Sequence, residues 1–94
     1  MEAKKTSKTE MPQDASLKLY YFEACPYCQK VLHVIDRLDI KSAIEFLDTR
    51  SEPKHREALI QLTGKTQVPC LEIDGKPLLE SEDIVTYLIQ RFAC

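Results

Sequence analysis

The sequence lacks the features that would indicate a membrane, a nucleic acid or the secretory pathway. No apolar run approaches the roughly 20 residues that a membrane-spanning helix needs, and the N-terminus carries no apolar segment like that of a secretory signal. Charge of neither sign is in large excess, because 13 Lys and Arg residues stand against 15 Asp and Glu residues. A basic footprint for nucleic acid is therefore absent. We expect a cytoplasmic protein without membrane or nucleic-acid partners, and we take it to be a monomer.

The four cysteines do not have the spacing of a secreted disulfide scaffold. Cys25 and Cys28 are too close together to link distant parts of a fold, and Cys70 and Cys94 stand alone. A zinc site made of four cysteines is disfavoured, because no second pair with the same spacing exists. We therefore expect no metal and a reducing compartment, with Cys70 either in the core or near the site and Cys94 exposed.

The chain is long enough for one small domain. Its 94 residues lie near the lower end of what buries a self-sufficient core, and we find no internal repeat. Residues 1–15 are polar and charged and lack periodicity. We expect a disordered N-terminal tail there, followed by a domain at residues 16–94.

Within that domain, hydrophobic periodicity and turn residues predict a series of short elements. Strands are expected at 17–22, 43–47, 69–73 and 76–79, and helices at 26–39, 53–63 and 81–92. Gly64 is positioned to end the second helix, and Asp74-Gly75 is a hairpin signal. Ser81 is expected to cap the last helix.

The order β-α-β-α-β-β-α predicts an α/β fold. A helix joins the first two strands, so these strands should be parallel with a right-handed crossover, whereas the last two should form an antiparallel hairpin. The expected result is a four-stranded mixed sheet flanked by three helices. Because a Cys-x-x-Cys motif follows the first strand, this is the thioredoxin-like arrangement.

The motif itself, Cys25-Pro26-Tyr27-Cys28, indicates thiol–disulfide exchange. Two cysteines at this spacing can close a small disulfide ring. Cys25 would also meet the free N–H groups and the positive dipole end of the helix that follows, which favour the thiolate. Cys28 lies one turn into the helix and should be less accessible. The pattern predicts Cys25 as the nucleophile and Cys28 as the residue that resolves mixed disulfides; two structural thiols remain the alternative.

Four motifs, taken together and in order, make residues 17–92 resemble a glutaredoxin. They are Cys25-Pro26-Tyr27-Cys28, Leu62-Thr63-Gly64, Gln67-Val68-Pro69 and Ser81-Glu82-Asp83-Ile84. The resemblance implies a glutathione-dependent thiol–disulfide oxidoreductase that reduces protein–glutathione mixed disulfides and protein disulfides. It also implies glutathione as a co-substrate, and no tightly bound cofactor.

The same resemblance implies where glutathione binds. The Tyr27 ring would line the groove, and a cis peptide bond before Pro69 would turn the Val68 backbone outward to pair with the extended tripeptide. Gln67 stands beside them, where the family usually has Thr. Arg56, on the second helix, aligns with a family position that contacts the glycyl carboxylate.

The γ-glutamyl end of glutathione is expected at the start of the last helix. By resemblance, its carboxylate would bind the backbone amides at Ser81, because a helix N-terminus is a ready anion site, and Glu82 would face its ammonium group. Leu79-Glu80 replaces the glycine pair that usually precedes this site. Glu80-Ser81 instead resembles the Glu-Ser of glutathione-transferase N-terminal domains. In that case Glu80 rather than Glu82 would meet the ammonium.

A further departure from the pattern lies just before Cys25. Glutaredoxins commonly carry a Lys three residues before the first cysteine, and here that residue is Phe22. Glu23 adds a negative charge nearby, which should oppose formation of the thiolate. Cys25 would then owe its activation mainly to the helix.

Three other functions remain as alternatives. The missing Lys suggests a redoxin that is reduced by thioredoxin reductase rather than by glutathione. An iron–sulfur carrier would bridge a cluster with Cys25 and glutathione from two subunits, although Pro26-Tyr27 argues against it, since carriers usually have Gly-Phe or a smaller residue there. A non-catalytic binding module would keep the fold as a scaffold, but both cysteines are retained.

Overall fold

The structure is a computed structural model that describes residues 16–93, so the expected tail at 1–15 and Cys94 lie outside the described residues. The elements are β2 (Leu17–Tyr21), α1 (Pro26–Leu38), the 3-10 turn η1 (Lys41–Ala43), β3 (Ile44–Asp48), α2 (Pro53–Thr63), β4 (Cys70–Ile73), β5 (Lys76–Leu78) and α3 (Ser81–Phe92). Every strand and helix predicted from the sequence is confirmed, with ends that differ by at most one residue. The short η1 turn was not expected.

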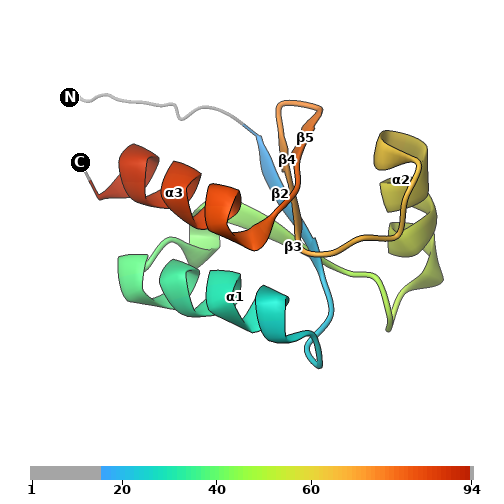
Figure 1. Ribbon diagram of the computed structural model, residues 1–94, viewed down its shortest axis with the longest axis horizontal. Helices are drawn as coiled ribbons and strands as arrows, with labels where there is room; N and C mark the ends of the chain where they lie inside the picture. The colour runs from blue at the N-terminus through green and yellow to red at the C-terminus, as the bar shows by residue number, and fades with distance from the viewer. Residues whose placement is uncertain (1–15, 94) are drawn as a thin grey trace.

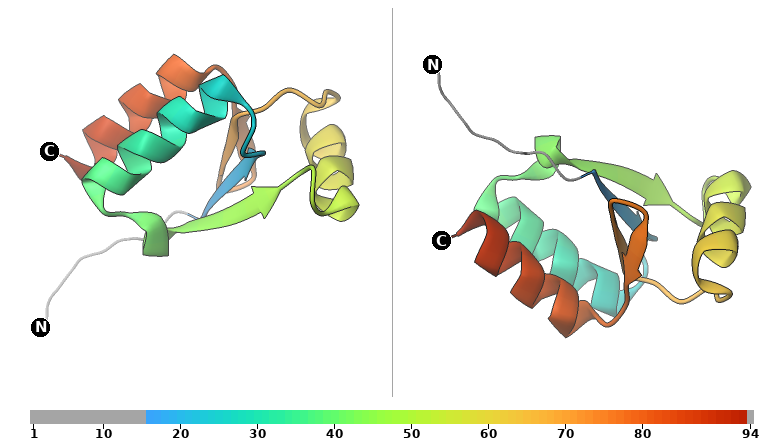
Figure 2. Two further views of the ribbon diagram at one scale, coloured as in Figure 1. Left: turned by 90° about the horizontal axis from the view of Figure 1, so that it is seen from below. Right: turned by 90° about the horizontal axis from the view of Figure 1, so that it is seen from above.

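The four strands form one mixed sheet in the order β3-β2-β4-β5. β2 runs parallel to β3, whereas β4 is antiparallel to both β2 and β5. Helices α1 and α3 lie side by side on one face of the sheet, and α2 covers the other face (Figures 1 and 2). The predicted thioredoxin-like fold is confirmed.

Among residues 16–93, no helix is both long and apolar enough to cross a bilayer.

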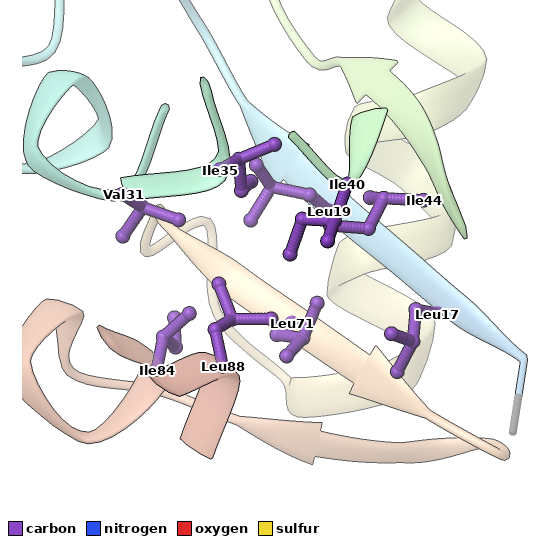
Figure 3. Close-up of a cluster of buried hydrophobic side chains, with 9 residues drawn as sticks. All are labelled: Leu17, Leu19, Val31, Ile35, Ile40, Ile44, Leu71, Ile84 and Leu88. Atoms are coloured by element: carbon purple, nitrogen blue, oxygen red, sulfur yellow. The ribbon is translucent and has the colours of Figure 1, made fainter. Parts of the chain in front are cut away.

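Two apolar clusters hold the sheet between its helices. The larger one lies under α1 and α3 (Figure 3), and its buried members are Leu17, Leu19, Val31, Ile35, Ile40, Ile44, Leu71, Ile84 and Leu88. The smaller one faces α2 and consists of Tyr20, Leu47, Leu59 and Cys70. Successive residues of a strand point to opposite faces, so Leu19 enters the first cluster and Tyr20 the second. Strand β2 is thereby buried on both faces, and the predicted place of Cys70 in the core is confirmed.

Residues at the ends of elements set most of the boundaries. Pro26 occupies the first turn of α1, where its missing N–H costs no hydrogen bond. Gly64 ends α2 with φ 77°, as predicted. Asp74 and Gly75 have φ 50° and 86° in the β4–β5 turn, the pair of positive values that a tight hairpin requires.

The predicted cap of α3 is wrong by one residue. The helix begins at Ser81, and its N-cap is Glu80, which makes no capping hydrogen bond with its side chain. The Glu80 carbonyl accepts the first helical bond from Ile84 N–H at 3.1 Å. Glu80 has φ 73°, a conformation that costs of order 1–3 kcal/mol in a residue other than glycine. The preference of serine for N-caps predicted the position of the helix but not this strained residue before it.

The α2-side cluster makes stability sensitive to alkaline pH. Burial raises the pKa of Cys70 from 9.0 to about 11, and burial together with the Glu72 hydrogen bond raises that of Tyr20 from 10.0 to about 12. Both groups keep their protons in the folded state at pH values where the unfolded chain loses them. Their contribution to stability is therefore full below about pH 9 and is lost as the pH rises toward 11 and 12.

We expect Cys70→Ala to lower the free energy of unfolding at pH 7.5, because it leaves a small cavity. Above pH 9, the free energy of unfolding of this variant should nevertheless fall less steeply than that of the unmutated protein, by up to about 1.4 kcal/mol per pH unit. Urea unfolding between pH 7.5 and 10.5 measures both slopes. Parallel declines would show that Cys70 does not titrate with unfolding.

Candidate functional site

The candidate site lies at the end of the sheet where β2 stops. Tyr20 pairs with Cys70, so the segment just before β4 lies beside the end of β2. Tyr21 pairs with Asp48 at the end of β3, and Thr49 N–H then donates to the Tyr21 carbonyl at 2.8 Å. The turn after β2, the loop after β3 and the segment before β4 are thus brought to one edge of the sheet.

Cys25 is held by the turn between β2 and α1. Its N–H donates to the Phe22 carbonyl at 3.2 Å, and Cys25 is itself the N-cap of α1, with extended backbone angles. The Cys25 Sγ accepts a hydrogen bond from Cys28 N–H at 3.3 Å. The sulfur therefore takes the position of a capping side chain and receives one of the N–H groups that the helix start leaves unpaired. A thiolate accepts such a bond better than a thiol does.

Cys28 is the less accessible of the two cysteines, as predicted. It is fully buried, whereas Cys25 retains 7% of its surface. Burial, reinforced by the hydrogen bond to Cys25, raises the pKa of Cys28 from 9.0 to about 12. Cys28 is therefore a thiol at neutral pH. Both residues are free cysteines in this structure.

A groove of about 610 Å³ lies at this edge of the sheet, and we name it the Ser81 groove. It is lined by Tyr27 and Lys30 of α1, by Gln67, Val68 and Pro69 before β4, and by Glu80, Ser81, Glu82 and Asp83 at the start of α3. All but one of the residues predicted to contact glutathione are thus brought together. The expected cis bond between Val68 and Pro69 is confirmed. Tyr27 is 62% exposed, so its ring is free to cover a ligand.

The charges of the Ser81 groove suit a zwitterion. Gln67 Nε2 donates to Glu80 Oε2 at 3.3 Å, which holds that carboxylate at the wall of the groove. Lys30 Nζ lies 3.9 Å from Glu82 Oε2, in an exposed ion pair. The groove therefore offers carboxylates that can bind a cation. Beside them, the N-terminus of α3 and Lys30 can bind an anion. The described part of the chain contains no group of His, Cys, Asp and Glu side chains suited to a metal ion.

The predicted glutathione contact that is not in the Ser81 groove is Arg56. It lines a second hollow of about 420 Å³, which we name the arginine hollow. The other lining residues are Phe22, Thr49, Arg50, Pro53 and Thr66. The two hollows are lined by neighbouring residues of the chain, Thr66 in one and Gln67 in the other.

Sequence reasoning missed two cations at the site, Lys30 and Arg50. Lys30 could have been found, because it stands three residues after Tyr27 and therefore shares its face of α1. Arg50 lies in the loop between β3 and α2, and its guanidinium carbon sits 4.1 Å from the centre of the Phe22 ring. No local pattern indicates that contact, since it depends on the parallel register of β2 and β3.

Comparison with known sequences places this geometry in a family. Residues 19–93 match the family described as "Glutathione S-transferase, N-terminal domain". The pyrimidodiazepine synthase of Drosophila melanogaster is 31% identical over 94 residues, which are 96% of this chain and 37% of that protein. A glutaredoxin of Ricinus communis is 32% identical over 72 residues, which are 76% of this chain and 71% of that protein.

Solved structures agree with the sequence comparison. A glutathione transferase family member from Pseudomonas fluorescens, solved with bound glutathione, is 28% identical and superimposes with a TM-score of 0.69 over 81% of this chain. The chain spans only 38% of that transferase and 37% of the Drosophila protein. This chain therefore belongs to the glutathione S-transferase N-terminal domain family of the thioredoxin-like superfamily.

Proposed function

We propose that this domain is a glutathione-dependent thiol–disulfide oxidoreductase with Cys25 as its nucleophile. The observation that carries the proposal is the position of Cys25 at the N-cap of α1, with Cys28 buried one turn further on. A transferase needs only to bind and activate glutathione, whereas a pair of sulfurs so arranged is suited to exchange of disulfides. The similarity to a glutaredoxin supports the same chemistry.

Glutathione would lie in the Ser81 groove. Its γ-glutamyl carboxylate would accept hydrogen bonds from the backbone at the start of α3, near Ser81, and its ammonium group would meet Glu80. The cysteinyl residue would pair with the Val68 backbone, under the Tyr27 ring. The Pseudomonas relative that holds glutathione supports this ligand.

Reduction of a protein–glutathione mixed disulfide then takes two exchange steps. The Cys25 thiolate attacks the glutathione sulfur, the mixed disulfide breaks, and the protein leaves as a thiolate that takes up a proton. A second glutathione, as thiolate, attacks the glutathione sulfur now bound to Cys25. Oxidised glutathione leaves and the Cys25 thiolate is restored. The sulfur of the second glutathione is oxidised and the sulfur of the substrate protein is reduced, so the two glutathiones end joined in one disulfide.

Protein disulfides would require Cys28 as well. Cys25 attacks one sulfur of the substrate and forms a mixed disulfide with it. Cys28 must then lose its proton to solvent, attack the Cys25 sulfur and release the reduced protein. This leaves a disulfide between Cys25 and Cys28, which two glutathiones reduce while they become oxidised glutathione. Because burial keeps Cys28 protonated at neutral pH, this second step should be slow compared with attack by free glutathione.

Substitution of each cysteine tests this division of labour. Cys25→Ser should abolish turnover of a glutathionylated peptide, whereas Cys28→Ser should retain it and lose reduction of a protein disulfide. Turnover is measured with glutathione, glutathione reductase and NADPH. Cys70→Ser, outside the exchange pair, is the matched control and should retain both activities. Equal loss of both activities in Cys28→Ser would contradict the assignment.

Neutralising each carboxylate of the Ser81 groove tests which one meets the ammonium group. Glu80 is held at the groove by Gln67, whereas the Glu82 side chain is 87% exposed and pairs with Lys30. We expect Glu80→Gln to raise the KM for glutathione about tenfold, the order expected for loss of a charge-assisted hydrogen bond. Glu82→Gln should have a smaller effect, with kcat little changed in both. A larger rise in KM for Glu82→Gln would reverse the assignment.

Transfer of glutathione to an electrophile is the second candidate function, favoured by the family match and by the transferase structures. That reaction needs bound glutathione but no exchange of disulfides. Conjugation of 1-chloro-2,4-dinitrobenzene, measured beside peptide deglutathionylation, separates the two. If conjugation is the faster activity and survives Cys25→Ser, the domain acts as a transferase.

A further inference from the structure

The arginine hollow contains a cation that the sequence pattern seemed to lack. Phe22 stands where glutaredoxins commonly carry a Lys, and the Arg50 guanidinium lies over its ring at 4.1 Å. Stacking on an aromatic face suits a guanidinium, which is planar and weakly hydrated. A positive charge is thus supplied to the Phe22 position from a different element, the loop after β3.

Backbone geometry fixes the position of Arg50. Tyr21 and Asp48 are paired at the ends of β2 and β3, so the residues just beyond them in the two chains lie next to each other. Asp48 Oδ1 accepts hydrogen bonds from Arg50 N–H at 2.8 Å and from Ser51 N–H at 2.9 Å. Those bonds lower the pKa of Asp48. They also tie its carboxylate to the loop backbone and not to the arginine side chains.

The hollow is therefore electropositive. Arg50 and Arg56 both line it, and within residues 16–93 neither side chain takes part in an ion pair. Thr49 and Thr66 add polar groups to the wall, and Phe22 adds an apolar one. Two guanidinium groups and a flat aromatic ring are suited to a carboxylate, which a guanidinium binds through two parallel hydrogen bonds.

The arginine hollow adjoins the Ser81 groove on its Gln67 side, and no residue of α3 lines it. Thr66 and Gln67, which are adjacent in the chain, line the hollow and the groove respectively. An extended tripeptide spans on the order of 10 Å. A ligand whose γ-glutamyl end lies at Ser81 and whose middle residue pairs with Val68 would therefore place its far end toward Thr66.

We infer that Arg50, held against Phe22, is a specificity-determining residue of this site: it binds the free glycyl carboxylate of glutathione in place of the missing Lys, beside Arg56. The inference rests on the proposed use of glutathione. It follows that the site selects thiols that carry a free carboxylate at this end. Because Phe22 offers a ring face, a guanidinium serves here better than an ammonium group would.

Kinetics with modified thiols tests the inference. The unmutated protein is assayed for deglutathionylation of a peptide with glutathione, with glutathione monoethyl ester blocked at the glycyl carboxylate, and with γ-glutamylcysteine. For each thiol, KM and kcat are determined with the Arg50→Gln, Arg50→Lys and Phe22→Leu variants. Arg37→Gln is the matched control, because Arg37 is an exposed arginine in the last turn of α1 that lines neither hollow.

We expect Arg50→Gln to raise the KM for glutathione about tenfold and to leave the KM for the ester unchanged, with little effect on kcat for either. Arg50→Lys should restore only part of the affinity, and Phe22→Leu should cause a smaller rise than Arg50→Gln. Arg37→Gln should have no effect. Thermal unfolding of each variant checks that the fold is retained.

Three results would overturn the inference, and they separate its failure from failure of the proposed function. If the unmutated protein uses glutathione but does not distinguish it from the ester, or if Arg50→Gln raises both KM values equally, the assignment of Arg50 fails and the proposed function stands. If the unmutated protein does not use glutathione at all, the proposed function fails and the inference fails with it.

Discussion

The site depends on the burial of β2 on both faces. Leu19 packs under α1 and α3 while Tyr20 packs toward α2, so the central strand cannot shift in either direction without exposing apolar surface. The end of β2 at Tyr21 is therefore held in place. The turn that follows holds Cys25 through the Phe22 carbonyl, and the helix that begins there aims a backbone N–H at the Cys25 sulfur. The Cys25 sulfur is thus positioned by residues anchored to the core.

The two strands that pair with β2 bring charged residues to the end of the sheet where Cys25 lies. The antiparallel partner β4 brings Pro69 and the Ser81 groove to one side, where carboxylates, Lys30 and the start of α3 lie. The parallel partner β3 brings the loop with Arg50 to the other side. A ligand with an ammonium group and two separated carboxylates matches this division. The two sulfurs also differ from each other, since burial raises the pKa of Cys28 and keeps it a thiol, whereas Cys25 retains 7% of its surface at the N-cap of α1.

Sequence reasoning located the elements and most of the groove because their signals are local. Alternation of apolar residues, Pro26 and Gly64 at helix ends, and Asp74-Gly75 in the hairpin all act within a few residues. Its failures were of two kinds. Serine's capping preference pointed to Ser81, whereas the chain places the strained Glu80 there and uses its side chain to bind Gln67. Arg50 could not be predicted, because its contact with Phe22 exists only once β2 and β3 are in register.

The central claim is that Cys25 carries the glutathionyl group, and trapping the adduct tests it most directly. The Cys28→Ser variant is mixed with oxidised glutathione at neutral pH, quenched with acid, and mapped by peptide mass spectrometry. The account predicts one glutathione per chain, bound to Cys25, and its removal by added reduced glutathione. An adduct that forms chiefly on Cys70 or Cys94, or no adduct on Cys25, would contradict it.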